Sequence, residues 1–67
     1  MTYYETGIRV QAAKGGYDYV DVFVTQSEDE ARKASQYDRR NYLARLTFEA
    51  DGCRTEYWCD GRWSSEP

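Results

Sequence analysis

Apolar and polar residues alternate along two early stretches of the chain, which predicts two β-strands. From Tyr4 to Ala12 every second residue is apolar or threonine, the period of a strand with one buried face. From Tyr17 to Thr25 valine occupies every second position beyond Tyr19, and β-branched residues favour strands. The segment Lys14-Gly15-Gly16 lies between these stretches and predicts the turn of a hairpin.

The length of that turn decides which residues of the hairpin face each other. A two-residue loop, Gly15-Gly16, would place Ile8 and Val10 on the face opposite to the valines. A three-residue loop pairs Val10 with Val20, Ile8 with Val22 and Arg9 with Asp21. We favour the three-residue loop, because it gathers the aliphatic side chains on one face and matches a salt pair.

A β-meander is predicted at the C-terminal end, where the pairs Asp51-Gly52 and Asp60-Gly61 separate runs of β-branched and aromatic residues. Asp-Gly is a strong signal for a two-residue hairpin turn, since both of its residues tolerate positive φ. The predicted strands are residues 42–50, 53–59 and 62–65. Two-residue loops at both turns would place three pairs of residues opposite each other: Glu49 and Arg54, Leu46 and Tyr57, Trp58 and Trp63.

A short helix is predicted over residues 28–37, between the hairpin and the meander. Ser27 and Glu30 have the spacing of a capping box, in which each side chain binds the backbone N–H of the other residue. Acids in the first turn suit the helix dipole. Small residues form a stripe at helical spacing, which suits close packing on a sheet: Ala31, Ala34 and Ser35.

These elements predict one small α+β domain over residues 1–67, a five-stranded antiparallel sheet in the order β-β-α-β-β-β with one short helix packed on one face. The face under the helix is expected to hold Ile8, Val10, Val20, Val22, Val24, Ala44, Leu46, Phe48 and Tyr57. The other face is expected to stay open and to display Tyr19, Asp21, Phe23, Arg45, Glu49, Glu56, Trp58 and Trp63. Two interpretations of the tryptophans are compatible: a cross-strand pair with Arg45 stacked on one ring, and a surface for a partner.

Composition argues against catalysis and against ordinary nucleic-acid binding. The chain has no histidine, and its 9 basic and 12 acidic residues give a net charge of −3, whereas nucleic-acid binding needs a basic surface. We therefore expect no enzyme, no catalytic residue, no cofactor and no metal. Cys53 and Cys59 lie six residues apart on one predicted strand, too far for a disulfide. Without a signal peptide or an apolar span, the chain is expected to be cytoplasmic.

The predicted topology and two short stretches resemble small phage-encoded anti-CRISPR proteins that act on type I interference complexes. The stretches are SEDEARKAS, from Ser27 to Ser35, and YWCDGRW, from Tyr57 to Trp63. They match an alanine-rich helix after a serine cap and a terminal Tyr-x-x-Asp-Gly-x-x-Trp hairpin, although the second stretch is one residue shorter. The resemblance implies an inhibitor in a bacterial host cell. Since this chain is acidic, it implies that carboxylates cover the basic surface where a Cascade-type complex receives DNA, as a DNA mimic would.

The first functional hypothesis is therefore an acidic inhibitor that binds a basic protein surface as a monomer. The alternative is a small regulatory module that closes its aromatic open face as a homodimer. Direct binding of nucleic acid is a third, disfavoured hypothesis. Candidate partner-binding residues come from the open face and from the helix start: Tyr19, Asp21, Glu28, Asp29, Glu30, Glu49, Glu56, Trp58 and Trp63.

Overall fold

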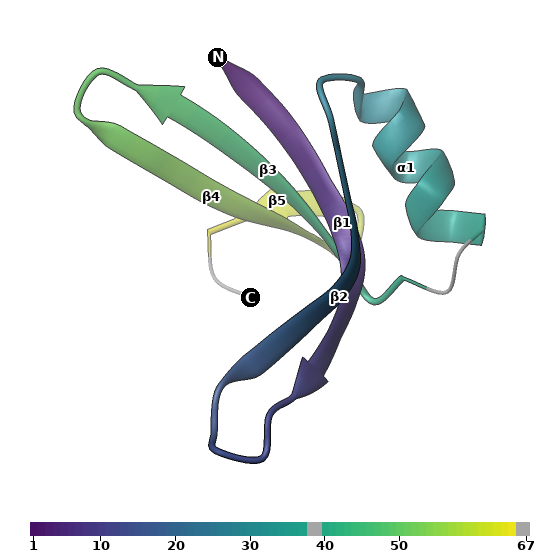
Figure 1. The fold of residues 1–67 in the computed structure, drawn as a ribbon. Coiled ribbons are helices and arrows are strands. Elements are labelled where there is room, and N and C mark those ends of the chain that lie inside the picture. The colour runs from purple at the N-terminus through teal and green to yellow at the C-terminus, as the bar shows by residue number, and fades with distance from the viewer. Residues whose placement is uncertain (38–39, 66–67) are drawn as a thin grey trace.

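The computed structural model describes residues 1–37 and 40–65. Its elements are β1 (Thr2–Gln11), β2 (Tyr17–Thr25), α1 (Glu28–Tyr37), β3 (Tyr42–Glu49), β4 (Gly52–Cys59) and β5 (Arg62–Ser64). The strands form one antiparallel sheet in the order β2-β1-β3-β4-β5, with α1 beside β1 and β2 (Figure 1). The predicted α+β class and element order are confirmed.

β1 joins the two halves of the sheet, because it pairs with β2 on one side and with β3 on the other. At one end of the β1–β3 seam, Met1 O accepts a hydrogen bond from Phe48 N at 2.8 Å. At the other end, the Asn41 side chain binds the backbone of Arg9 twice, accepting from its N–H at 2.7 Å and donating to its carbonyl at 2.8 Å. Asn41 thus continues the ladder with an amide side chain in place of backbone.

The helix lies on the opposite face of the meander from the one predicted. Arg45 is paired with Tyr4 and with Glu56, so these residues share a face with Trp58 and its partner Trp63. The guanidinium of Arg32 on α1 lies 3.9 Å from the ring centre of Trp58. The expectation that Leu46, Phe48 and Tyr57 support the helix is therefore wrong. Alternation sorted the meander residues correctly into two faces, but it carries no information about which face the helix takes.

The register of the first hairpin also differs from the prediction. Gln11 is paired with Tyr17 and Ile8 with Val20, so residues 12–16 form a five-residue loop. Gly15 and Gly16 both have positive φ, 92° and 74°. This lets the loop close by a hydrogen bond from Ala12 N to Gly16 O at 3.1 Å. The predicted pairs of Val10 with Val20, Ile8 with Val22 and Arg9 with Asp21 are wrong.

A β-bulge divides β2 and separates the three valines. The register shifts between Thr6 and Ile8, so Gly7 lies opposite two residues, Asp21 and Val22, and Asp21 adopts a φ of 52°. Such a bulge reverses which side chains point to which face beyond it. Val20 shares the face of Ile8, whereas Val24 is paired with Glu5 on the open face and Phe23 with Thr6 on the helix face. The predictions that the valines share the helix face and that Phe23 lies on the open face are wrong.

The structure confirms the predicted pairing at the second turn of the meander but not at the first. Trp58 is paired with Trp63 as predicted, and Asp60 and Gly61 have φ values of 51° and 81°, as a type I′ turn requires. In the first turn Glu49 is paired with Gly52, so the turn is at residues 50–51 and the predicted register is wrong by two residues. A shift by two keeps every side chain on its face.

The helix begins and ends as predicted, but its cap is only half the predicted box. Ser27 Oγ accepts the hydrogen bond from Glu30 N at 3.2 Å. The Glu30 carboxylate instead accepts from Thr25 Oγ1 at 2.9 Å, and Thr25 Oγ1 accepts from Ser27 N at 3.1 Å. This chain of contacts ties the helix start to the end of β2. Ala31 is fully buried, which confirms that the small stripe packs on the sheet.

The core is small for a chain of 67 residues. Four hydrophobic residues of the described chain are buried, together with the polar Thr6, whose Oγ1 donates to Tyr42 O at 2.6 Å. The buried hydrophobic residues are Ala31, Tyr42, Leu43 and Ala44. Much apolar surface therefore remains outside the core, and its distribution defines the candidate binding surfaces.

Candidate protein-binding surface

The two tryptophans form an aromatic cluster with two arginines between the helix and the meander. The rings of Trp58 and Trp63 lie 5.2 Å apart between centres, at 70°. Arg32 covers Trp58 at 3.9 Å, and Arg45 covers Trp63 at 4.6 Å. The predicted cross-strand pair with Arg45 on one ring is confirmed, but both rings are partly buried on the helix side. The prediction that the two rings face outward on an open face is wrong. We call Arg32, Arg45, Trp58 and Trp63 the helix-side cluster.

The acids beside this cluster are neutralised by arginines. The Arg45 guanidinium donates to Glu56 Oε1 at 2.9 Å, and Arg54 lies 4.0 Å from the same oxygen. Arg54 also pairs with Glu49 at 3.6 Å. Glu49 and Glu56 therefore belong to a mixed-charge surface on the helix side, and the prediction that they lie on the open face is wrong. Their negative potential is largely cancelled locally.

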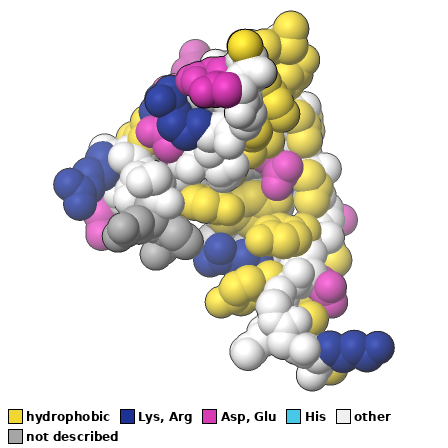
Figure 2. Space-filling model, turned by 90° about the vertical axis from the view of Figure 1, so that its left-hand side faces the viewer, with side chains coloured by type: hydrophobic (Ala, Val, Ile, Leu, Met, Phe, Trp, Pro, Cys, Tyr) yellow, Lys and Arg dark blue, Asp and Glu magenta, His cyan; other side chains and the backbone are white. Residues whose placement is uncertain are grey.

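The open face is instead apolar and rich in tyrosine. We define it by Tyr3, Leu46, Phe48 and Tyr57, which lie opposite to the helix side of the sheet. Figure 2 shows this side of the molecule, where hydrophobic side chains gather in a band with scattered charges. Phe48 is 47% exposed and stacks edge-on against Tyr3 with ring centres 5.8 Å apart. The open face was missed from the sequence because Leu46, Phe48 and Tyr57 were assigned to the face under the helix.

A hydrogen-bonded tyrosine–carboxylate pair lies beside the open face, between β1 and the start of β3. Tyr42 donates its hydroxyl to Glu5 Oε2 at 2.8 Å, and the ring of Tyr19 packs edge-on against Tyr42 with centres 5.4 Å apart. Burial first, and then the hydrogen bond to Glu5, raise the pKa of the Tyr42 hydroxyl far above its ordinary value. The phenol thus stays protonated and holds the carboxylate in place. Tyr19 lies on the open side as predicted, and it helps to cover Tyr42.

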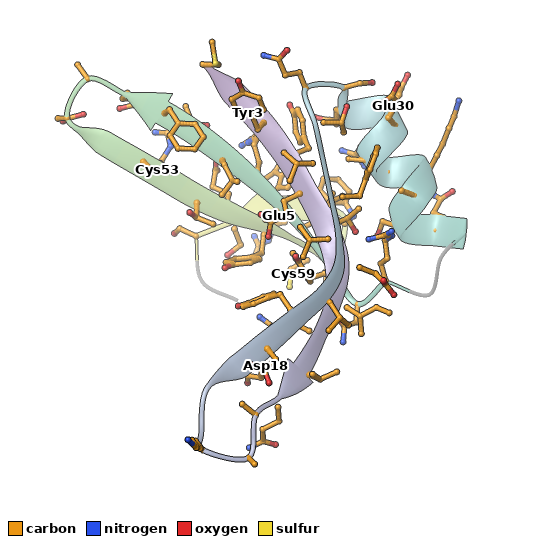
Figure 3. The ribbon with its side chains drawn as sticks, in the orientation of Figure 1. Tyr3, Glu5, Asp18, Glu30, Cys53 and Cys59 are labelled. Atoms are coloured by element: carbon orange, nitrogen blue, oxygen red, sulfur yellow. The ribbon has the colours of Figure 1, made fainter. Side chains whose placement is uncertain are left out.

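The free edge of β2 carries the second accessible apolar surface. β2 ends the strand order, so only β1 flanks it. The exposed fractions of its large hydrophobic side chains run from 37% at Phe23 to 58% at Tyr17. Asp18 lies near the hairpin tip of this strand, and Glu30 lies near its other end (Figure 3). The isolated Gly7 inside a strand pattern was the sequence signal for the bulge that shapes this edge.

The acidic helix start adjoins the end of β2. Glu28 pairs with Arg32 at 2.9 Å, whereas Asp29 and Glu30 are exposed and form no ion pair within the described residues. The pKa of the Tyr4 hydroxyl is raised by burial and then by the charge of Glu28. The Glu30 carboxylate accepts a hydrogen bond from Thr25 at the end of β2. The acidic helix start therefore adjoins the strand that carries Asp18 and Asp21.

The nine predicted binding residues thus fall into separate places. Asp21, Glu28, Asp29 and Glu30 lie along β2 and the adjoining helix start, which we call the acidic edge. Tyr19 belongs to the open side. Trp58 and Trp63, with the acids Glu49 and Glu56, belong to the helix side. Of the two predicted patches, the helix start is the one whose carboxylates remain mostly unpaired.

The described residues contain no buried site suited to a small molecule. A shallow hollow of about 450 Å³ is lined by residues of β4, of β5 and just after β5, which include Arg54, Arg62 and the carboxylate of Glu56. A hollow of about 70 Å³ lies beside Asn41 and is lined by Arg9 of β1 and by residues of β3 and β4. In residues 1–37 and 40–65, no group of three or more potential metal ligands is placed so that it could hold a metal ion. Among those residues, no helix is long and apolar enough to cross a membrane.

Both cysteines are free thiols at exposed positions of β4. Cys53 lies opposite Phe48 at one end of the strand, and Cys59 lies opposite Arg62 at the other end (Figure 3). The strand between them is continuous from Gly52 to Cys59, so the prediction that they do not bridge each other is confirmed. They mark both ends of β4 on the open side.

Comparisons of the chain with protein-family models, with curated proteins and with solved structures find no match.

Proposed function

We propose that the protein is a non-enzymatic inhibitor that binds a basic surface of another protein through its acidic edge. The observation that carries this proposal is the position of its unpaired carboxylates. Asp21, Asp29 and Glu30 follow one another along β2 and the helix start, whereas Glu49 and Glu56 are paired with arginines. Unpaired carboxylates beside exposed apolar residues can both steer a basic partner and bury surface against it.

The resemblance to anti-CRISPR proteins suggests which partner to test first. A type I effector complex receives DNA on a surface lined by lysine and arginine, and an acidic edge on a small domain has the charge to cover such a surface. Under this proposal the protein competes with DNA, and raising the salt concentration weakens the competition. The protein acts as a monomer and does not itself bind nucleic acid.

The test measures binding of target DNA to a purified type I effector complex at increasing concentrations of the protein. Neutralising the helix start with Asp29→Asn/Glu30→Gln is expected to weaken inhibition about three- to tenfold, since each exposed ion pair contributes about 0.2–1 kcal/mol. The matched control, Asp51→Asn/Asp60→Asn, removes two turn carboxylates and should inhibit like the wild type. DNA binding that stays unchanged at saturating wild-type protein would refute the blocking mechanism.

A second candidate function is self-association through the open face. The observation that favours it is the uncovered group of Tyr3, Leu46, Phe48 and Tyr57 on the side away from the helix. Two such faces packed together would form a sandwich with both helices outside. A stable interface buries about 800 Å² of each partner, an area of the order that the broad side of a molecule with overall extents of 35 × 28 × 21 Å offers.

Two substitutions of similarly exposed residues test self-association. Phe48 is 47% exposed on the open face, and Val10 is 43% exposed on strand β1 with its side chain on the helix face. Under this second candidate, sedimentation equilibrium shows a dimer that Phe48→Ser dissociates and Val10→Ser preserves. A wild-type chain that sediments as a monomer at several hundred micromolar would exclude this candidate.

A further inference from the structure

The free edge of β2 has the properties of a strand that lacks a neighbour. Side chains on both of its faces are about half exposed, with Phe23 at 37% on the helix face and Val24 at 51% on the open face. A second flanking strand would bring cross-strand neighbours to these side chains and cover more of them. The edge backbone also presents N–H and C=O groups without a strand partner.

The two edges of the sheet differ in length and in charge. The opposite edge, β5, has three residues, whereas β2 has nine. β2 has no lysine or proline to protect its length. The bulge at Asp21 protects part of the strand, and the charges that β2 carries are the carboxylates of Asp18 and Asp21. Neither carboxylate forms an ion pair within the described residues.

The bulge limits the part of β2 that can accept another strand. Asp21 has a left-handed backbone conformation, and its carbonyl oxygen already accepts a hydrogen bond from the Arg40 guanidinium. Val22 belongs to the bulge beside Asp21, and from Phe23 to Thr25 the strand is regular and paired with β1. The segment from Val22 to Thr25 is bounded by Asp21 at one end and, through the contact of Thr25 with Glu30, by the acidic helix start at the other.

Charge makes a second copy of this chain a poor occupant of the edge. A symmetric antiparallel pair centred on Phe23 would place Asp21 of one copy beside Thr25 and Glu30 of the other, at both ends of the contact. Like charges directly opposite each other destabilise a sheet. The same arrangement favours an incoming strand with a basic residue at each end.

We infer that the edge segment Val22–Thr25 binds an extended segment of a partner protein by strand addition. This partner segment has β-branched residues at its centre and lysine or arginine at both ends. The ends are about 13 Å apart, four residues at about 3.3 Å each. Main-chain hydrogen bonds supply the binding, and the basic ends select for the acidic edge. This inference rests on the proposed function, because it specifies how a basic partner meets the acidic edge.

The test uses three capped peptides and amide chemical shifts of the ¹⁵N-labelled protein. The first peptide, Lys-Val-Thr-Val-Lys, is expected to bind in the millimolar range and to shift amides of residues 22–25. The second has glutamate at both ends and is expected to bind at least tenfold more weakly. The third has the lysines but carries N-methyl groups on both valines, which remove backbone donors, and is expected to lose binding by a similar factor.

Matched variants locate the site on the protein. Asp21→Asn/Glu30→Gln keeps a residue that tolerates positive φ and keeps an acceptor for Thr25, and it is expected to weaken the lysine peptide about three- to tenfold. Asp51→Asn/Asp60→Asn removes two charges from the meander turns and is expected to leave the affinity unchanged. Slower hydrogen exchange of the amides of residues 22–25 on binding would support strand addition.

Each contrary result has a distinct meaning. Equal binding of the N-methylated peptide would overturn strand addition and leave the proposed function standing, because charge alone would then suffice. Shifts confined to residues outside β2, or no binding at several millimolar, would also overturn strand addition. Concentration-dependent shifts of residues 22–25 without peptide would assign the edge to a second copy of the chain. Inhibition of a basic partner that resists the Asp29→Asn/Glu30→Gln variant would instead refute the proposed function.

Discussion

The contact between Arg32 and Trp58 gives the sharpest test of where the helix lies. Arg32 is on α1 and Trp58 on β4, and the guanidinium lies 3.9 Å from the ring centre. If the helix packed on the face of Leu46 and Phe48, Arg32 and Trp58 would be on opposite sides of the sheet. A double-mutant cycle therefore distinguishes the two arrangements by the coupling between these residues.

The expected coupling can be worked out from the geometry. A cation–π contact contributes about 0.5–1 kcal/mol when exposed and about 2 kcal/mol when desolvated. The Arg32 side chain is 33% exposed, so we expect about 1 kcal/mol. A domain of this length has a total free energy of unfolding of about 3–10 kcal/mol, so this coupling is measurable.

The assay is urea unfolding followed by circular dichroism for the wild type, Arg32→Met, Trp58→Leu and the double variant. Methionine keeps an apolar stem of similar length while removing the charge. The control cycle combines Arg32→Met with Phe48→Leu on the open face, where effects should add within about 0.3 kcal/mol. Loss of the Glu28 ion pair is common to both cycles and cancels. A coupling below about 0.3 kcal/mol between Arg32 and Trp58 would refute the helix placement.

Three further substitutions test the core, the tyrosine pair and a turn. Ala31→Leu should lower the free energy of unfolding by about 1–3 kcal/mol through overpacking of a fully buried site, whereas Lys33→Leu on the exposed side of the helix should change it little in the same urea titration. Because burial and Glu5 raise the pKa of Tyr42, the folded state keeps a proton that the unfolded chain loses near pH 10. Tyr42 should therefore lower the free energy of unfolding by about 1.4 kcal/mol per pH unit above about pH 10, and Tyr42→Phe should remove this part of the slope while the part from Tyr4 remains. Gly61→Ala should cost about 1–2 kcal/mol in thermal unfolding, because φ is 81° and no atom near the added methyl group offers compensation.

Local signals in the sequence were sufficient to predict the elements of this fold. The bounds of β2 and α1 were predicted correctly, because Ser27 caps the helix and the valine alternation marks the strand. The pair Asp60-Gly61 gave the correct turn and the correct Trp58–Trp63 pairing. In each of these cases, a few neighbouring residues determine the structure by themselves.

Long-range relations were not predictable in the same way. At the bulge, a Cβ on Gly7 would lie 3.1 Å from the Tyr42 hydroxyl and 3.1 Å from the Val20 carbonyl oxygen, and both contacts come from residues distant in the sequence. The choice of the tryptophan face depends on Arg32 stacking on Trp58 across two elements. The acidic helix start was identified as a candidate site, but the neutralisation of Glu56 by Arg45 follows only from their pairing across β3 and β4.

The sheet consists of two units formed by strands that are neighbours in the sequence, the hairpin β1–β2 and the meander β3–β4–β5. The pairing of β1 with β3 joins them. Each other strand pair connects neighbours in the sequence, so it can form after closing a short loop. Closing β1 against β3 spans the whole of β2 and α1, and Asn41 completes the ladder only after this step. We therefore expect the assembly of the seam to limit the folding rate. The chain should also tolerate a backbone cut before Asn41, with the two fragments reassociating along β1 and β3.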